Sequence, residues 1–161
     1  MISGRAWPAR RRHPPRPPID GQGLTDPAFT SRYWGPEFAT DWKAGSTMVW
    51  RQGGADTADP GQVVLESEPY RRLSYTWHTF TPGWAKANGI DDETLAKLAA
   101  EQRSKVTFEI KHLGGSVKLT VVHDGFEPGS TAREMIRHGW PALLSSLKTL
   151  LETGDTLPDP A

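Results

Sequence analysis

Two runs of residues in the second half of the chain alternate apolar and polar side chains. They span residues 105–111 and 116–123, with Gly114-Gly115 between them. A period of two is that of a strand with one buried face, and a glycine pair between two such runs is typical of a hairpin turn. The face predicted to point inward consists of Val106, Phe108, Ile110, Val117, Leu119, Val121 and His123. We therefore predict a β-hairpin with His123 on its buried face.

Three shorter runs earlier in the chain are rich in β-branched and aromatic residues, which favour strands. They span residues 47–52, 62–67 and 72–78. Gly53-Gly54 and Asp59-Pro60-Gly61 supply turn residues between the first run and the second, and residues 68–71 separate the second from the third. We predict turns at these places and a hairpin formed by the second and third runs.

Helical periodicity occurs in three segments. Asp26 and Pro27 are typical of the N-cap and first position of a short helix over residues 27–33. Residues 90–101 have acidic residues near their start and apolar residues at intervals of three and four positions, which predicts a second short helix. A longer stripe begins after Ala132 and ends before Gly154, a typical C′ residue. Its apolar members are Met135, Ile136, Trp140, Leu143, Leu144, Leu147, Leu150 and Leu151, and Pro141 predicts a kink among them.

The first 20 residues differ from the rest in composition. They contain five Arg and one Asp, a net charge of 5 − 1 = +4, together with five Pro. Proline lacks a backbone donor and favours extended conformations, so we predict a disordered Arg/Pro-rich tail over residues 1–20. The alternatives are a basic arm for nucleic acid or membrane, and a start codon placed in error. One folded domain over residues 24–154 and a short tail over residues 155–161 complete the expected organisation.

Composition and charge exclude several classes of protein. The chain has 161 residues, which favours one domain, and it has no cysteine, which excludes disulfides and Cys-ligated zinc. Its 19 basic and 19 acidic residues balance, which argues against a nucleic-acid-binding protein. No stretch approaches the roughly 20 apolar residues that cross a bilayer, and no signal-peptide core is evident. We expect a cytoplasmic protein without a membrane span.

Several motifs occur in an order that resembles a known family. They are Trp42-Lys43-Ala44-Gly45, residues 61–66, residues 69–77, residues 104–109, residues 119–126, Gly139-Trp140 and residues 147–154. Together they resemble the activator of heat-shock protein 90 ATPase homologue-like family of the START-like (SRPBCC) superfamily, over about residues 24–154. The resemblance implies an α+β helix-grip fold, in which a curved antiparallel sheet wraps around a long C-terminal helix and leaves a cavity between them.

The chain departs from this family at its start. Family members usually open with a strand and a helix before the segment Leu24-Thr25-Asp26-Pro27, whereas here the Arg/Pro tract takes that place. We therefore expect the first strand to be missing. The strand over residues 116–123 would then have an unpaired edge, through which a dimer could form.

Ten side chains are candidates for binding a small hydrophobic or aromatic ligand in that cavity, because they are apolar or aromatic and are predicted to face it. They are Trp50, Tyr75, Trp77, Phe108, Leu119, Val121, His123, Met135, Trp140 and Leu144. The same pattern would arise if these side chains simply filled a core. His123 either forms a hydrogen bond with a ligand or is satisfied within the protein. His78 and His138 are predicted to lie on the surface.

The sequence leaves three functions open. We favour a START-like module that binds a small hydrophobic ligand without chemistry of its own. The alternatives are a protein-interaction module comparable to the family's namesake, which regulates a chaperone ATPase, and a START-like cyclase or hydrolase. The sequence shows no nucleophile motif, phosphate-binding loop or histidine pair at metal-ligand spacing, so we predict no catalytic residue, cofactor or metal site. An enclosed aromatic pocket with one or two inward polar groups favours the first function, a filled core with an exposed apolar patch the second, and paired inward titratable groups the third.

Overall fold

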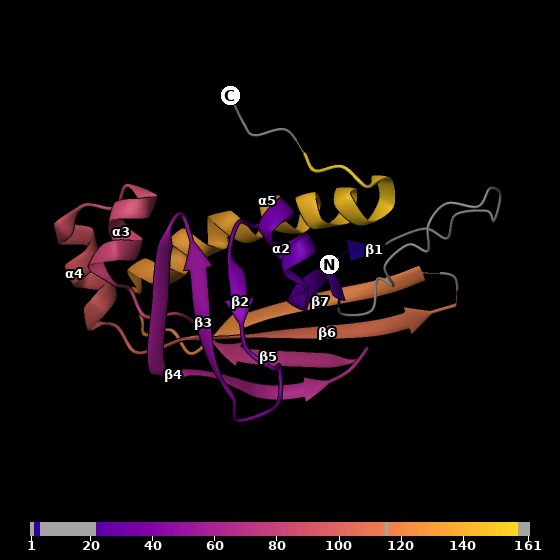
Figure 1. Cartoon of the computed structure of the whole chain (residues 1–161), viewed down its shortest axis with the longest axis horizontal. Coiled ribbons are helices and arrows are strands. Elements are labelled where there is room, and N and C mark those ends of the chain that lie inside the picture. Colours follow the sequence, from indigo (N-terminus) through magenta and orange to yellow (C-terminus); the bar gives the residue numbers. More distant parts are fainter. Residues whose placement is uncertain (1, 4–21, 115, 158–161) are drawn as a thin grey trace.

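A seven-stranded antiparallel sheet with helices on one side forms the structure, a computed structural model that describes residues 2–3, 22–114 and 116–157 (Figure 1). The strands are β1 (Ile2–Ser3), β2 (Glu37–Ala39), β3 (Thr47–Gln52), β4 (Ala55–Glu68), β5 (Arg72–Thr76), β6 (Lys105–Leu113) and β7 (Ser116–Asp124), in the sheet order β1-β7-β6-β5-β4-β3-β2. The helices are α1 (Gln22–Thr25), α2 (Pro27–Tyr33), α3 (Pro82–Asn88), α4 (Asp92–Ala100) and α5 (Thr131–Thr153). The predicted α+β class is confirmed.

The hairpin predicted from strict alternation is the longest paired segment of the sheet. β6 and β7 pair from Lys105↔Asp124 to Leu113↔Ser116 without a register shift. Val106 and Phe108 are buried, as the period-two pattern requires for one inward face. The second predicted hairpin, β4 with β5, is also present.

β4 corrects one of the predicted turns. Asp59-Pro60-Gly61 is not a turn between two strands but lies within the single 14-residue strand β4. The β3 to β4 register jumps from Val49↔Ala58 to Thr47↔Val63, so an irregular bulge contains the Pro and Gly. Proline is tolerated at such a bulge because the ladder is already interrupted there.

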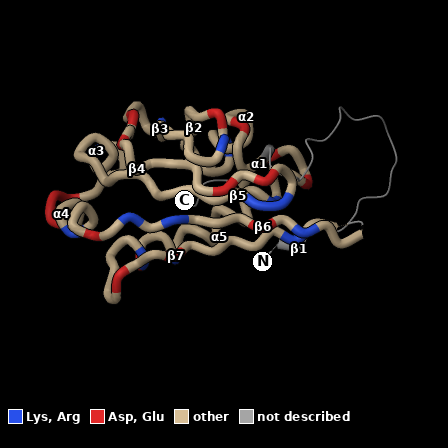
Figure 2. The backbone as a smooth tube through the Cα atoms, turned by 90° about the horizontal axis from the view of Figure 1, so that it is seen from below, with Lys and Arg blue, Asp and Glu red and all other residues tan. Residues whose placement is uncertain are grey.

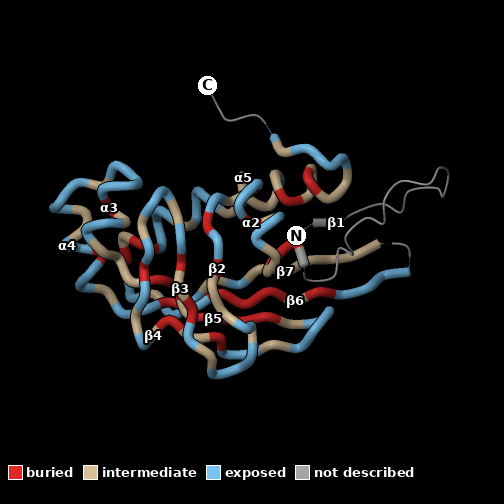
Figure 3. The backbone as a smooth tube through the Cα atoms, viewed as in Figure 1, coloured by how far each residue is buried: buried red, intermediate tan, exposed pale blue. Residues whose placement is uncertain are grey.

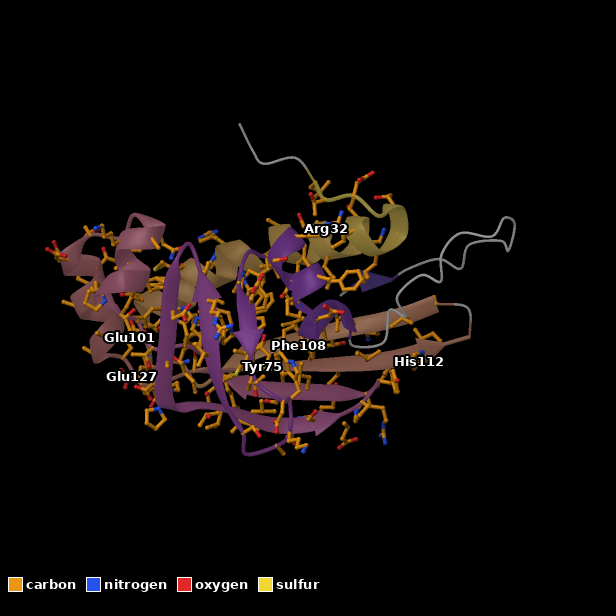
Figure 4. All side chains as sticks on the ribbon, viewed as in Figure 1. Arg32, Tyr75, Glu101, Phe108, His112 and Glu127 are labelled. Atoms are coloured by element: carbon orange, nitrogen blue, oxygen red, sulfur yellow. The ribbon has the colours of Figure 1, made fainter. Side chains whose placement is uncertain are left out.

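The predicted helices begin and end close to where their capping residues indicate. The Asp26 side chain accepts a hydrogen bond from the backbone N–H of Ala28 at the start of α2. Gly154 ends α5 in the left-handed conformation, at φ 84°, which glycine adopts without steric cost. Arg32 of α2 donates to the carbonyl of Gly154 at 2.7 Å, which ties α2 to the end of α5 (Figure 4). The sequence predicted one helix between β5 and β6, whereas the structure has two, α3 and α4.

The start of α5 is fixed by a residue from the segment before β6. The carboxylate of Glu101 accepts hydrogen bonds from Ser130 Oγ at 2.5 Å and from the N–H of Thr131 at 2.6 Å. These groups belong to the first turn of α5, where backbone donors have no helical acceptor. Glu101 therefore anchors the long helix at one end, and the contact of α2 with Gly154 anchors it at the other.

The expectation of a missing first strand is corrected. Ile2–Ser3 forms the short strand β1, which pairs with β7 at Ile2↔Leu119 and Ser3↔Lys118. Two residues cover only part of the β7 edge. Among the described residues, no strand pairs with the outer edge of residues 120–124. The rest of the tail predicted to be disordered, residue 1 and residues 4–20, lies outside the described residues.

The core lies between the concave face of the sheet and α5, where the buried segments gather in Figure 3. Its most deeply buried side chains include Met48, Val64, Tyr75, Val106 and Phe108. Charged residues alternate with the core residues along the strands and lie on the other face of the sheet. There Arg72 forms ion pairs with Glu66 and Glu109. Figure 2 shows acidic and basic segments along the same strands. In the described part of the chain, no helix is long and apolar enough to cross a bilayer.

Candidate functional site

Aromatic rings fill the middle of the space between the sheet and α5. The ring of Trp34, at the end of α2, lies 5.3 to 5.9 Å between centroids from four others. These four are Phe38, Trp50, Trp77 and Trp140. Tyr75 and Phe108, which lie near the centre of the molecule in Figure 4, extend the cluster along the sheet at 5.9 Å. Trp50, Tyr75 and Phe108, predicted to line a cavity, lie in this packed core.

Three buried side-chain polar atoms within the described residues have no hydrogen-bond partner. They are Thr30 Oγ1, Trp50 Nε1 and Tyr75 OH. The Tyr75 side chain is fully buried, and burial raises the pKa of its phenol well above the ordinary value. A buried hydroxyl without a partner costs about 1–3 kcal/mol of stability. The Tyr75 hydroxyl therefore either destabilises the empty protein or serves a ligand.

We expect Tyr75→Phe to keep or raise the stability of the protein, by up to about 1–2 kcal/mol, because it removes the unpaired hydroxyl and keeps the ring. The free energy of unfolding in urea measures the effect. Ser74→Ala is the control, because Ser74 Oγ is buried but bonded to the Val106 carbonyl and to Thr107 Oγ1, both at 3.0 Å. That change should destabilise. A loss of more than about 1 kcal/mol in Tyr75→Phe would mean that the hydroxyl has a partner.

A groove opens at the flank of this core, between α5 and the end of β7. Its volume is about 660 Å³. The lining residues are His123, Phe126, Arg133, Ile136, Arg137, Trp140, Pro141, Leu144, Ser145 and Lys148. Five of these ten residues are apolar or aromatic, and two of them, Ile136 and Trp140, also line a smaller pocket of about 140 Å³ together with Trp34, Trp77 and Leu143. The groove adjoins the part of the β7 edge that β1 leaves uncovered.

His123 lines the groove and has a partner on each ring nitrogen. Trp140 Nε1 can only donate, and it donates to His123 Nδ1 at 3.2 Å. The ring proton is therefore on Nε2, which donates to Ser104 Oγ at 2.8 Å. Burial lowers the pKa of His123 to about 4, so the ring is neutral at pH 7. Of the two alternatives for this residue, satisfaction within the protein describes the geometry.

The groove brings together only some of the predicted ligand-binding residues. His123, Trp140 and Leu144 line it, and Trp77 lines the smaller pocket beside it. Leu119 and Val121 are half-buried and pack against the core without lining either space. Met135 is a correction, because its side chain is 37% exposed and the neighbouring Ile136 takes its place in the groove.

His78 is a second correction, because it is buried rather than on the surface. It is 6% exposed, its ring contacts those of Trp50, Phe80 and Trp84, and Nδ1 donates to the Thr79 carbonyl at 2.9 Å. Burial lowers its pKa to about 4. The prediction extended a strand through residue 78, whereas β5 ends at Thr76 and the alternation of sides ends with it. His138 is exposed, as predicted.

Sequence reasoning missed seven of the ten groove residues, which are Phe126, Arg133, Ile136, Arg137, Pro141, Ser145 and Lys148. Phe126 follows the Asp124-Gly125 turn, outside any periodic segment. Ile136 belongs to the predicted apolar stripe, but the stripe alone does not tell which of its members line an opening. Trp34 was also missed, because it lies just beyond the C-terminus of α2 and outside the periodic segment.

Comparison with known proteins identifies the family. Residues 22–152 match the family model described as Activator of Hsp90 ATPase homolog 1-like protein. The chain belongs to this family. The matched span includes both hairpins and nearly all of α5, which agrees with the resemblance carried by the sequence motifs. A search of curated proteins finds no match to the chain.

Several solved structures share the fold of this chain. A protein from Mesorhizobium loti is 24% identical, with a TM-score of 0.62 over 83% of this chain and 87% of that one. The Aha1 dimer from Colwellia psychrerythraea is 18% identical, with a TM-score of 0.56 over 83% and 85%. CalU16 from Micromonospora echinospora is 20% identical, with a TM-score of 0.52 over 86% and 68%. The fold of this chain is therefore START-like.

Proposed function

We propose that this protein is a binding module that holds a small hydrophobic or aromatic ligand between α5 and β7, without chemistry of its own. The observation that carries the proposal is the groove, whose apolar lining includes Phe126, Ile136, Trp140 and Leu144. Its volume of about 660 Å³ falls within the range of small-molecule sites. Rings fill the middle of the core, so the proposed site is not the enclosed pocket expected there but a groove at the flank of the core.

The chemistry of the lining supports a ligand that is flat or acyl rather than strongly polar. Trp140 lines the groove and is held by its bond to His123. An indole fixed in this way offers a rigid surface on which an aromatic ring can stack. Since both nitrogens of His123 are occupied, we assign its ring to the wall of the site and not to a hydrogen bond with the ligand.

N-Phenyl-1-naphthylamine, a neutral aromatic fluorophore, tests this proposal. We expect a saturable rise in its fluorescence with the wild-type protein. Ser145→Phe should weaken binding at least about tenfold, because Ser145 is an exposed residue of the groove wall and a ring there occupies the ligand's space. Ser31→Phe on α2 is the matched control, since both serines are exposed and bond the carbonyl four residues back. No binding by the wild type, or equal binding by both variants, would refute the proposal.

Membership of a family described by Hsp90 ATPase activation supports a second candidate, a protein-interaction module. The filled aromatic core favours this candidate, and Val122 on β7, which is 46% exposed at the sheet edge that β1 leaves open, offers an apolar contact surface. Addition of the protein to a chaperone ATPase assay tests it. Stimulation that survives in Ser145→Phe and is lost in Val122→Glu would favour this candidate over ligand binding.

A further inference from the structure

We propose that the ligand of this groove is an anionic amphiphile, an acyl or aryl group that carries a carboxylate, with the carboxylate held by Arg133 and Arg137. This inference rests on the proposed function, because it names the class of ligand for the same site. It depends on the charged residues that line the groove, whereas the proposed function depends on the apolar ones.

The lining of the groove carries positive charge only. Arg133, Arg137 and Lys148 contribute three cations, and no Asp or Glu is among the lining residues. His123 adds no charge at pH 7, because burial lowers its pKa. The whole chain is neutral, so this imbalance is local. An apolar cleft with charges of one sign along its rim attracts ligands of the opposite sign.

These cations are available to a ligand. Among the described residues, Arg133 forms no ion pair. Arg137 lies 3.7 Å from Glu134, and both side chains are more than half exposed. Lys148 lies 3.0 Å from Glu152, one turn further along α5. Exposed pairs of this kind contribute only about 0.2–1 kcal/mol, so a carboxylate that also buries apolar surface competes with them.

The order of residues along α5 places the anion and the apolar part of the ligand. Arg133 and Arg137 are four residues apart, so they project from one face on successive turns. Trp140 and Leu144 follow on the next two turns of the same flank. At about 1.5 Å per residue, Leu144 lies roughly 10 Å beyond Arg137 along the helix axis. A carboxylate between the two arginines therefore leaves the acyl or aryl group on Trp140 and Leu144.

A pair of probes that differ only in charge tests this assignment. We use 11-(dansylamino)undecanoic acid and its methyl ester, and measure dissociation constants from dansyl fluorescence. We expect the wild type to bind the acid about tenfold more tightly than the ester at low salt, with the difference shrinking as ionic strength rises. The double variant Arg133→Gln with Arg137→Gln should bind both probes equally, near the affinity of the wild type for the ester.

The control removes the same charge elsewhere. Arg51 and Arg71 are exposed, with side chains 55% and 78% accessible, and they lie on β3 and beside the β4 to β5 turn. Arg51→Gln with Arg71→Gln should keep the tenfold preference for the acid. Equal binding of acid and ester by the wild type would overturn the anionic assignment and leave the proposed function intact. Failure of both probes to bind would overturn the proposed function with it.

Discussion

Gln62→Met is expected to cost roughly 3–5 kcal/mol of stability, although it replaces one side chain by another of similar length. Gln62 is fully buried in β4, and its amide uses both donors. Nε2 donates to the carbonyls of Met48 and Thr57, each at 2.9 Å. Oε1 accepts from the N–H of Thr79 at 2.9 Å. Methionine removes all three bonds, and each buried backbone group that is left without a partner costs about 1–3 kcal/mol.

The bulge in β4 explains why a side chain is needed there. The ladder between β3 and β4 is interrupted between Thr47 and Val49, so the Met48 carbonyl has no strand partner across the shift. The amide of Gln62 replaces the missing ladder bonds and connects β3, β4 and the segment after β5. The loss would be a large share of the total stability of a domain of this size.

Urea unfolding followed by tryptophan fluorescence measures the loss. Gln102→Met is the matched control, because Gln102 is exposed and forms one bond, to the Gly125 carbonyl at 2.6 Å. It should change stability by less than about 1 kcal/mol. A comparably small change in Gln62→Met would show that water replaces the amide and that the bulge does not depend on it.

The same bulge shows where sequence reasoning reached its limit. The hairpin of β6 and β7 was predictable because its signal is local: each alternation of side chains lies within one strand, and the turn lies between them. The Asp59-Pro60-Gly61 segment also has a local signal, that of a turn. It lies in a strand because Gln62 bonds to residues from β3 and from the segment after β5, and no local pattern reveals those partners.

The sequence predicted which kinds of side chain lie between the sheet and α5, but not where the groove opens. The sequence predicted aromatic side chains between sheet and helix, and Trp50, Tyr75 and Trp140 do lie there. Which of them border open space depends on how the rings pack and on the rotation of α5. Neighbouring positions of a helix differ in direction by about 100°, so Met135 points to solvent while Ile136 lines the groove.

Stability is expected to fall as the pH decreases from about 6.5 to about 4, because buried His78 and half-buried His123 are held in neutral form in the folded protein. Burial lowers the pKa of both His78 and His123 to about 4 in the folded protein. In the unfolded chain both return to about 6.5. Between these values the unfolded state binds protons that the folded state does not, so acidification favours unfolding. Each pKa unit is worth about 1.4 kcal/mol per histidine, and the two together give a loss of several kcal/mol.

The carboxylates do not account for this loss. Hydrogen bonds lower the pKa of Asp41, Asp59 and Asp91 below the ordinary value of 3.8, so the stability that they contribute disappears only in more acidic solution. The window between pH 6.5 and 4 therefore reports mainly on the buried histidines. Within it, protonation of His123 Nδ1 would also displace the bond from Trp140 Nε1 and change tryptophan emission.

Urea unfolding at a series of pH values tests the assignment. The double variant His78→Gln with His123→Gln should be less stable at pH 7 but should lose little further stability down to pH 4, because neither side chain titrates. The double variant of the exposed histidines, His112→Gln with His138→Gln, should retain the slope of the wild type. A wild-type free energy of unfolding that stays constant from pH 6.5 to 4 would mean that the buried rings accept protons without cost. Our assignment of a single neutral tautomer to His123, and of its ring to the wall of the groove, would then be wrong.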